Sequence, residues 1–473
     1  MLASLFSCLL CFAPLDGAHA LGDDAGLVSL APQLRESMRS TGLPASAFAI
    51  VVRPLGKRRG INIAFNDKKP MSPASTMKLV TTYAALDLLG PAFQWRTEAF
   101  SAGALHDDVL EGDLMIRGGG DPKLVVENLW SLVQRIRAYG VREIRGDVVL
   151  DRSAFEPLLH DPALFDGEPL RPYNTGPDPL LLNFKTLSFA FVPDPDSHIV
   201  RVIASPPMSG LRWPAMLGGD DGPCNDWRAH LQADFSNPLD PVFRGTFPVS
   251  CGERVWHVSV LDHATYFGAV FRALWEGAGG TWSGQVRDGT VPPEARRIAE
   301  NLSPPLVDVI RDINKFSNNV MARQVFLTLG AETSGHAANA ELSAQAIRDW
   351  LAKRAIAMPE LVLENGSGLS RIERTTAAGM AHLLVAAFDG PLMPEFMASL
   401  PLVNVDGLAR AQSAAAGSAH VKSGSLQEVR AEAGYMRAKN GARYVLVVFV
   451  NHPLAADSQR FLDFILDWLY LNG

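Results

Sequence analysis

The two ends of this 473-residue chain carry elements of the same kind, which narrows the folds it can adopt. The residue pattern predicts an amphipathic helix over 27–38 and a strand over 47–52. Near the C-terminus it predicts strands at 435–437 and 443–451, followed by a helix over 457–471. Because both ends supply a strand and a helix, we expect them to share one sheet.

The last helix is predicted to pack on that sheet. Its apolar residues recur at steps of three and four, at Phe461, Phe464, Ile465, Trp468 and Leu471. The alternative is a membrane anchor, but Asp463 and Asp467 occupy the polar face, where anionic lipid favours Lys and Arg. No stretch reaches the roughly 18 uninterrupted apolar residues of a spanning helix, so we expect no transmembrane span.

The middle of the chain, 91–256, differs from the two ends in its predicted elements and in the composition of its loops. Strands are predicted at 112–117, 147–151 and 199–204 and a helix at 128–138, with loops dense in Gly, Pro and Asp between them. We therefore expect a β-rich inserted region here, formed as one unit or as two lobes.

Residues 1–20 are predicted to be a signal peptide. An apolar run from Leu2 to Leu15 precedes Ala18-His19-Ala20, the small-x-small pattern of a cleavage site before Leu21. A buried N-terminal helix is the alternative, and the usual Lys or Arg is missing from the start of the segment. Cys8 does not lie in a convincing lipobox. We expect an exported, periplasmic protein and not a lipoprotein.

The charge and the cysteines restrict partners and compartment further. The net charge of −7 argues against nucleic acid, since phosphate binding needs a basic field. After signal cleavage only Cys224 and Cys251 remain, both in the inserted region. In an oxidising compartment they could close a loop worth about 3 kcal/mol. Two free thiols remain the alternative, because sequence does not show whether the Cα atoms come within bonding range.

Several common catalytic signatures are absent from the sequence. It contains no G-x-S-x-G, no H-E-x-x-H and no Walker loop, and Gly118-Gly119-Gly120 lacks the spacing of a dinucleotide site. The 11 histidines show no clustering of the kind that binds metal. We therefore expect neither a nucleotide cofactor nor a catalytic metal.

The first candidate for chemistry is an S-x-x-K motif at Ser75 and Lys78. Ser72 is predicted to cap a helix with Pro73 in its first turn, and Gly90 to end it. Residues three apart share a helix face, so the amine can reach the hydroxyl. A lysine can take a serine's proton only if its pKa is pulled well below about 10.4 by burial or a second cation. The alternative is a helix start with a surface lysine.

The second candidate is an S-x-N motif at Ser317 and Asn319. It lies between an apolar segment at 306–313 and a helical run at 320–329, so the hinge can point short side chains into a cleft. Ser317 offers a hydroxyl for proton relay and Asn319 an amide for a substrate carbonyl. The alternative is a plain turn between helices, with Ser or Asn as the cap.

The third candidate is Lys422-Ser423-Gly424, followed by strand patterns at 431–437 and 443–451. A cation beside a hydroxyl on a strand edge can bind a carboxylate, and Gly424 lets a substrate backbone approach closely. The alternative is a glycine bulge on an edge strand that the lysine protects from pairing.

Each motif alone is weak, but the three together are specific. Each occurs once, in the order S-x-x-K, S-x-N, K-[S/T]-G that marks penicillin-binding proteins and class A β-lactamases. Over nearly all its mature length the chain resembles the D-alanyl-D-alanine carboxypeptidase/endopeptidase family, the low-molecular-mass class C penicillin-binding proteins. Further matching blocks lie at 119–122, 314–315, 365–371 and 433–435.

The resemblance implies an α+β fold. The expected architecture is a serine β-lactamase/DD-transpeptidase-like domain, with an antiparallel sheet flanked by helices, a helical subdomain and a large β-rich insertion. That discontinuous domain would comprise 21–90 and 257–473, interrupted by 91–256. Two departures from the family pattern are visible: Ser423 replaces the commoner threonine but keeps the hydroxyl, and Asn365 replaces an aspartate and removes a charge from its loop.

The resemblance also implies an acyl-enzyme mechanism. Ser75 would attack the peptide carbonyl, Lys78 take its proton and Ser317 relay a proton to the leaving amine. Lys422 would keep Lys78 electrostatically poised, and Asn319 would hold the substrate amide.

The same resemblance assigns the substrate-binding groups to the third motif. The oxyanion would lie between the backbone N–H groups of Ser75 and Ser425. Lys422, Ser423, Gly424 and Ser425 would form the site for the substrate's terminal carboxylate.

The implied activity is hydrolysis of peptidoglycan stem peptides, at D-Ala-D-Ala ends and at D-Ala-diamino acid cross-links. Penicillin would acylate Ser75. Two alternatives remain open, a β-lactamase and an inactive peptidoglycan-binding scaffold. The sequence also leaves open a homodimer and a cell-wall enzyme bound through the insertion.

Overall fold

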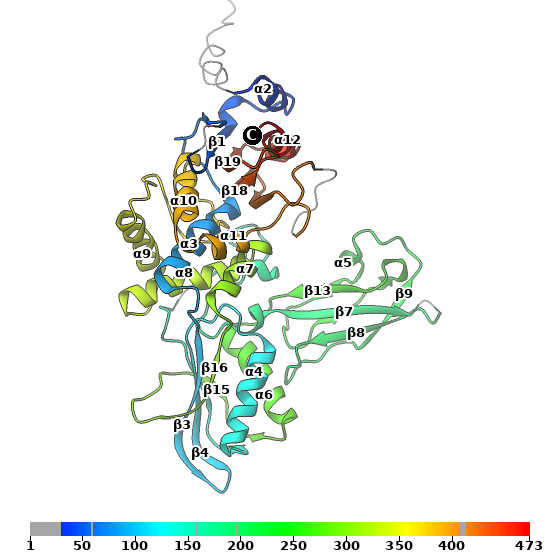
Figure 1. Cartoon of the computed structure of the whole chain (residues 1–473). Coiled ribbons are helices and arrows are strands. Elements are labelled where there is room, and N and C mark those ends of the chain that lie inside the picture. The colour runs from blue at the N-terminus through cyan, green and yellow to red at the C-terminus, as the bar shows by residue number, and fades with distance from the viewer. Residues whose placement is uncertain (1–29, 58–59, 158, 195, 407–412) are drawn as a thin grey trace, which may run out of the picture.

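The computed structural model describes residues 30–57, 60–157, 159–194, 196–406 and 413–473 (Figure 1). The predicted signal peptide lies outside these residues. None of the described helices combines the length and apolarity needed to cross a membrane.

The two ends of the chain share one sheet, as predicted. Its five strands run in the order β17-β18-β19-β1-β2, and every pair is antiparallel. The strands are β1 (Phe48–Pro54), β2 (Ile63–Phe65), β17 (Ala419–Leu426), β18 (Val429–Arg437) and β19 (Arg443–Asn451). The expected α+β fold class is confirmed.

Both faces of this sheet are covered, which explains the unbroken apolar runs in β1 and β19. Along β1, Phe48 and Ile50 face one hydrophobic core, and Ala49 and Val51 face another. The first core is completed by α2 (Pro32–Arg39) and α12 (Gln459–Asn472), which lie side by side at the top of Figure 1. The second core is completed by helices that carry the catalytic candidates.

Helix α12 packs on the sheet as predicted, but its buried face overlaps the predicted stripe only in part. Phe464 and Leu471 are 37% and 56% exposed, so they do not belong to the buried face. That face is formed by Phe461, Leu462, Ile465, Leu466 and Leu469. The predicted packing is confirmed for Phe461, Ile465 and Trp468, and it fails for Phe464 and Leu471 because α12 contacts both β18 and α2, so neighbouring positions such as 461 and 462 are buried together.

Six helices form the helical subdomain on the other side of the sheet. They are α3 (Lys78–Leu89), α7 (Leu306–Lys315), α8 (Asn319–Ser334), α9 (Ala340–Lys353), α10 (Ala377–Asp389) and α11 (Met393–Ser399). Helix α3 lies at their centre, and every residue from Lys78 to Leu86 is buried. A helix buried on all sides has no polar face. Its first residue, Lys78, is therefore enclosed by the subdomain.

The inserted region forms two lobes, each with its own sheet (Figure 1). The inner lobe contains α4 (Val126–Tyr139), α6 (His263–Gly277), β3 (Arg96–His106), β4 (Val109–Gly118), β5 (Glu143–Ile144), β6 (Val148–Asp151), β14 (Thr281–Trp282), β15 (Val286–Asp288) and β16 (Arg296–Leu302). The outer lobe contains α5 (Trp227–His230), β7 (Leu187–Asp194), β8 (Ile199–Ser205), β9 (Met216–Asp220), β10 (Ala233–Asp234), β11 (Val242–Phe243), β12 (Phe247–Pro248) and β13 (Arg254–Val258). The strands and the helix predicted here correspond to β4, β6, β8 and α4, although the strand predicted at 147–151 begins one residue before β6.

The insertion extends further along the chain than the boundary expected at 256. Strand β16 pairs antiparallel with β3, and Leu302 lies opposite Arg96. Phe267, Phe271 and Trp275 of α6 belong to the core of the insertion. An amphipathic helix has the same composition whichever core it faces, so the change of texture near 257 marked the start of α6 and not the end of the insertion.

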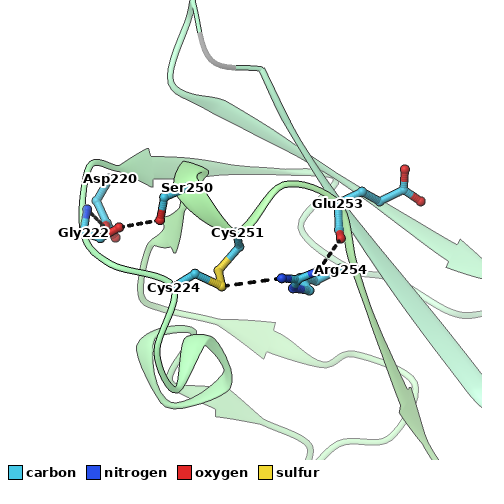
Figure 2. The surroundings of a disulfide bond; sticks show 7 residues. All are labelled: Asp220, Gly222, Cys224, Ser250, Cys251, Glu253 and Arg254. Atoms are coloured by element: carbon cyan, nitrogen blue, oxygen red, sulfur yellow. Dashed lines mark hydrogen bonds between the residues drawn. A yellow bond between two sulfur atoms is a disulfide. The ribbon is translucent and has the colours of Figure 1, made fainter. Parts of the chain in front are cut away.

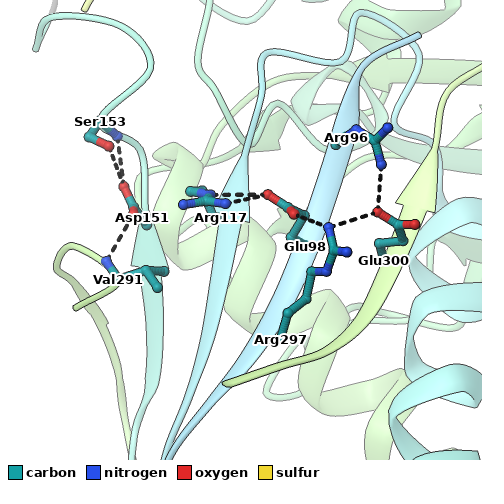
Figure 3. Close-up of polar contacts among 8 residues, drawn as sticks. All are labelled: Arg96, Glu98, Arg117, Asp151, Ser153, Val291, Arg297 and Glu300. Carbon is teal, nitrogen blue, oxygen red and sulfur yellow. Dashed lines mark hydrogen bonds and ion pairs between the residues drawn. The ribbon is translucent and has the colours of Figure 1, made fainter. Parts of the chain in front are cut away.

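Ion pairs connect the strands at the base of the inner lobe (Figure 3). Glu98 on β3 accepts hydrogen bonds from Arg117 on β4, at 2.6 Å, and from Arg297 on β16, at 2.8 Å. Burial acts to raise the pKa of Glu98, but the two arginines outweigh it and lower that pKa. Arg96 and Glu300 form a further pair, at 2.8 Å. The strands that enter and leave the insertion are therefore held together by charge as well as by backbone pairing.

The insertion is also fixed against α8, the helix that begins at Asn319. Arg323 donates to the Thr175 carbonyl at 2.9 Å. Gln324 accepts from the Asp178 backbone N–H at 2.9 Å and donates to the Asp178 carbonyl at 2.8 Å. These side chains are buried, so the bonds are shielded from water.

Cys224 and Cys251 are joined in the outer lobe (Figure 2). Cys224 and Cys251 have Cα atoms 4.8 Å apart and form a disulfide, as expected. The bond connects the loop before α5 to the short helix η5 (Val249–Cys251), and Ser250 donates to the Gly222 carbonyl beside it at 2.8 Å. The crosslink therefore anchors the far end of this lobe.

Removing the crosslink should destabilise the outer lobe. The double substitution of Cys224 and Cys251 by alanine restores the conformational freedom of the unfolded loop, which costs about 3 kcal/mol. We expect faster native-state proteolysis within 187–258 and little change in catalytic rate. Reducing the unsubstituted protein should have the same effect. Equal protease resistance with and without the bond would show that it contributes nothing.

Candidate active site

The three motifs, distant in sequence, meet at one cavity. Ser75 lies in the 3-10 turn η2 (Ala74–Met77), Ser317 between α7 and α8, and Lys422 on the edge strand β17. All three line a cavity of about 350 Å3, together with Ser423 and Ser425. The sequence-predicted site residues are therefore brought together by the fold.

The nucleophile turn differs in detail from the prediction. The chain enters α3 through η2, and no side chain caps the helix, so the expected cap by Ser72 is absent. Residues three apart eclipse one another in a 3-10 turn, which brings Lys78 Nζ within 3.1 Å of Ser75 Oγ. Asn451, at the end of β19, fixes this turn. Its amide accepts from the Ser72 N–H at 2.8 Å and donates to the Ser72 carbonyl at 3.0 Å.

The Lys78 amine is enclosed and has neutral acceptors. The side chain is fully buried, and Nζ donates to Ser75 Oγ at 3.1 Å, to Asn319 Oδ1 at 2.6 Å and to the Ser367 carbonyl at 2.5 Å. Burial lowers the pKa of Lys78 well below its usual value, and nearby Lys422 lowers it further. The reading of Lys78 as an ordinary surface lysine is wrong.

The hinge between α7 and α8 uses neither motif side chain as a helix cap, and Ser317 lines the cavity. Asn318 caps α8, accepting from the Met321 N–H at 3.0 Å, so neither Ser317 nor Asn319 serves as the cap. Ser317 has a positive φ of 55°, which turns the chain sharply between the two helices. Just upstream, buried Asn314 donates to Ser399 Oγ at 2.9 Å and so anchors the end of α7.

Lys422 is also fully enclosed. Its Nζ donates to Ser317 Oγ at 3.0 Å and to the Ser423 carbonyl at 2.7 Å, and burial lowers its pKa to about 7. Strand β17 pairs with β18 without interruption through Gly424, which excludes a glycine bulge. A Cβ on Gly424 would lie 2.9 Å from Ser75 N, so this glycine is what allows the strand to contact the nucleophile turn.

Lys422 should lower the free energy of unfolding of the protein at neutral pH. Because its folded pKa lies below the unfolded value of about 10.4, the unfolded chain binds more protons between about pH 7 and 10, and stability rises with pH across that window. We expect Lys422→Met to raise the free energy of unfolding by about 1–3 kcal/mol near pH 7 while abolishing activity. Urea unfolding at pH 7 and pH 10 should show the gain shrinking at the higher pH. Lys353→Met, on an exposed position, should show neither effect.

The loop over 365–373 contributes groups that sequence reasoning did not assign. The Ser367 carbonyl holds Lys78, and Gly368, with φ of 80°, packs so closely that a Cβ would lie 1.9 Å from the Ala74 carbonyl. The matching block at 365–371 pointed to this loop without giving it a role. Glu373, which is buried, and Asn451, which is partly buried, were missed because a single polar residue carries no signal of its own.

The described residues contain no group of three or more His, Cys, Asp or Glu side chains placed to hold a metal ion.

Comparison with known proteins now decides the family. The sequence matches the D-Ala-D-Ala carboxypeptidase 3 (S13) family over residues 30–467. The chain belongs to this family. The predicted resemblance is confirmed, and the protein is a serine-type D-Ala-D-Ala carboxypeptidase.

Two relatives of this S13 carboxypeptidase extend over most of its length. The D-alanyl-D-alanine carboxypeptidase of Actinomadura sp. (strain R39) is 28% identical over 471 residues, covering 93% of this chain and 86% of that one. The D-alanyl-D-alanine carboxypeptidase DacB of Haemophilus influenzae is 26% identical over 420 residues, 82% of each chain. The crystal structure of penicillin binding protein 4 (dacB) from H. influenzae superposes with a TM-score of 0.76 at 22% identity, covering 93% of this chain and 100% of that one.

Proposed function

We propose that this carboxypeptidase hydrolyses the D-Ala-D-Ala ends of peptidoglycan stem peptides through an acyl-enzyme on Ser75, and that it also cuts D-Ala-diamino acid cross-links. The observation that carries the proposal is the Lys78 amine. It is fully buried, lies 3.1 Å from Ser75 Oγ and, within the part of the chain that the structure describes, donates to neutral acceptors. A carboxylate partner would hold the ammonium form, whereas neutral acceptors and burial favour a free amine.

The geometry supports a complete cycle. Ser75 Oγ attacks the carbonyl carbon while its proton passes to Lys78, and the amine leaves as the tetrahedral intermediate collapses. The leaving nitrogen takes a proton from Lys422 through Ser317 Oγ, which accepts from Lys422 Nζ at 3.0 Å, and the proton held by Lys78 then passes to Lys422, so that both amines return to their starting states. Water attacks the ester and gives a proton to Lys78, which passes it to Ser75 Oγ as the carboxylic acid product leaves.

The oxyanion and the substrate carboxylate are assigned to β17. We place the oxyanion between the backbone N–H groups of Ser75 and Ser425, because Gly424 brings the strand against the nucleophile turn. Lys422, Ser423 and Ser425 line the cavity on the same side and supply a cation and two hydroxyls for the terminal carboxylate. Asn319, which accepts from Lys78 at 2.6 Å, is placed to hold the substrate amide once the amine has moved.

Penicillin binding belongs to the same proposal. The H. influenzae penicillin binding protein 4 has been solved in complex with a β-lactam, at a TM-score of 0.73 to this chain. A β-lactam presents a strained amide with a carboxylate nearby, so it fits a site that pairs Ser75 with Lys422. Because peptidoglycan lies outside the cytoplasmic membrane, we propose that the enzyme acts in the periplasm, in keeping with the signal peptide predicted at 1–20.

Ser75→Ala should abolish both penicillin labelling and peptide cleavage, lowering the cleavage rate by at least about 1,000-fold. Intact-protein mass spectrometry should show one penicilloyl adduct on the unsubstituted protein and none on the variant. Purified monomeric pentapeptides and cross-linked dimers would separate carboxypeptidase from endopeptidase activity. Rapid loss of the adduct by turnover would indicate a β-lactamase. Equal cleavage by Ser75→Ala and the unsubstituted protein would contradict the proposal.

A further inference from the structure

Behind the nucleophile turn, the carboxylate of Glu373 gathers four backbone N–H groups. Glu373 is 1% exposed. Its Oε1 accepts from Glu364 N at 3.1 Å, Asn365 N at 3.0 Å and Gly366 N at 2.7 Å, and its Oε2 accepts from Gly368 N at 2.8 Å. A buried carboxylate at the centre of a loop fixes that loop's peptide planes.

One of these peptide units also contacts Lys78. The N–H of Gly368 and the carbonyl of Ser367 belong to the same planar peptide unit. The N–H end donates to Glu373 at 2.8 Å, and the carbonyl end accepts from Lys78 Nζ at 2.5 Å. Glu373 therefore both orients this carbonyl and polarises it, because hydrogen bonds in a chain strengthen one another.

The negative charge of Glu373 also acts on Lys78 electrostatically. It raises the pKa of Lys78, against burial, Lys422 and Arg323, which all lower it. Burial raises the pKa of Glu373 itself, but its backbone partners are all N–H donors, which favour the ionised carboxylate. A lysine whose basicity fell without limit would lose the capacity to take a proton from serine.

We propose that Glu373 is a positioning residue for the reaction, holding the Lys78 amine toward Ser75 through the 367–368 peptide unit and supplying a buried negative charge behind it. The proposal rests on the proposed role of Lys78 as the base. Glu373 lies behind Lys78 and touches neither Ser75 nor the cavity where substrate would bind.

The asparagine at 365 fits this arrangement. Its Oδ1 accepts from Ser367 N at 3.0 Å and from Ser367 Oγ at 2.6 Å, and its Nδ2 donates to the Leu369 carbonyl at 3.1 Å. An aspartate there would lose the donor and bring a second carboxylate into the loop that already encloses Glu373. The loop therefore contains one buried carboxylate, that of Glu373. The neutral side chain of Asn365 avoids a second one.

The test is the pH dependence of penicillin acylation by Glu373→Gln. The acid limb of the rate profile reports protonation of Lys78, so losing the negative charge should move it down by about 0.5–1 pH unit. The maximal acylation rate should fall by about 10- to 100-fold, because the Gly368 N–H then faces an amide that cannot satisfy both carboxylate positions. Glu364→Gln removes a charge from an exposed position of the same loop and should leave the limb in place. A lower melting temperature with an unmoved acid limb and rate would overturn the proposal.

Two further variants distinguish the proposed role of Glu373 from a general loss of folding. Asn365→Asp combined with Glu373→Gln returns one carboxylate to the loop and should move the acid limb at least half of the way back. Glu373→Asp keeps the charge with a shorter reach, so acylation should slow while the limb stays in place. An unchanged rate in Glu373→Asp, or no return of the limb in the double variant, would count against the proposal. If the unsubstituted protein forms no adduct, the proposed function fails; if it does and Glu373→Gln behaves like it, only this inference fails.

Discussion

Lys78→Ala should slow acylation of Ser75 by about 100- to 10,000-fold while leaving the protein folded. The substitution removes the base that lies 3.1 Å from Ser75 Oγ, and general base catalysis is worth about 100- to 10,000-fold. Folding should survive, because burying an amine at a depressed pKa costs the folded state free energy that alanine does not. The measurement is the time course of adduct formation by intact-protein mass spectrometry.

Lys78→Arg is the matched control for this experiment. A guanidinium keeps the positive charge and the donors but cannot be deprotonated in a protein, so it separates charge from basicity. We expect Lys78→Arg to be as inactive as Lys78→Ala. Recovery of a substantial rate with arginine would mean that position 78 acts by its charge alone, and a Lys78→Ala rate within tenfold of the unsubstituted enzyme would remove lysine from the mechanism.

Gly368→Ala should damage both the stability and the acylation rate of the protein. Gly368 has φ of 80°, and a Cβ there would lie 1.9 Å from the Ala74 carbonyl and 2.8 Å from Ser75 N. One or both backbones must move, and a displacement of about 1 Å at a reacting group costs roughly 100-fold in rate. We expect a loss of at least about 3 kcal/mol in stability together with that loss of acylation rate.

Gly441→Ala separates the two causes of the damage. Gly441 has φ of 85°, but a Cβ there would have no atom within 4 Å, so alanine meets only the left-handed backbone penalty of about 1 kcal/mol. Thermal unfolding and adduct formation should be measured for both variants. If Gly368→Ala were no worse than Gly441→Ala, the close contact between the loop and the nucleophile turn would not exist in solution.

The strands at the two ends of the chain were predictable because an unbroken run of apolar residues is enough to indicate a buried strand. The run at 443–451 is apolar on both faces, and it became β19 with the predicted bounds. The face of α12 was not predictable at the same level. Which apolar side chains of a helix are buried depends on two neighbours, and Phe464 and Leu462 are equally apolar in sequence.

The motif residues could be predicted for a different reason. Ser75, Ser317 and Lys422 are the residue types that acyl transfer requires, and their order restricts the families that carry them. What sequence could not show is how Lys78 is enclosed beside Ser75. Its burial depends on a carbonyl at position 367, in a loop held by Glu373, and that proximity exists only once the helical subdomain has formed.

The insertion leaves the main domain and returns to it at neighbouring points. Arg96, where β3 begins, and Leu302, where β16 ends, are opposite one another across an antiparallel pair. The chain therefore leaves the host domain and re-enters it at adjacent points, as it would with a single tight hairpin. The path of the chain through the host domain does not have to change to accommodate the insertion. Segments with adjacent ends are those that proteins tolerate as insertions, so the host domain can carry both lobes without a change in its own fold. The same geometry marks 96 and 302 as the natural places to exchange the lobes between relatives.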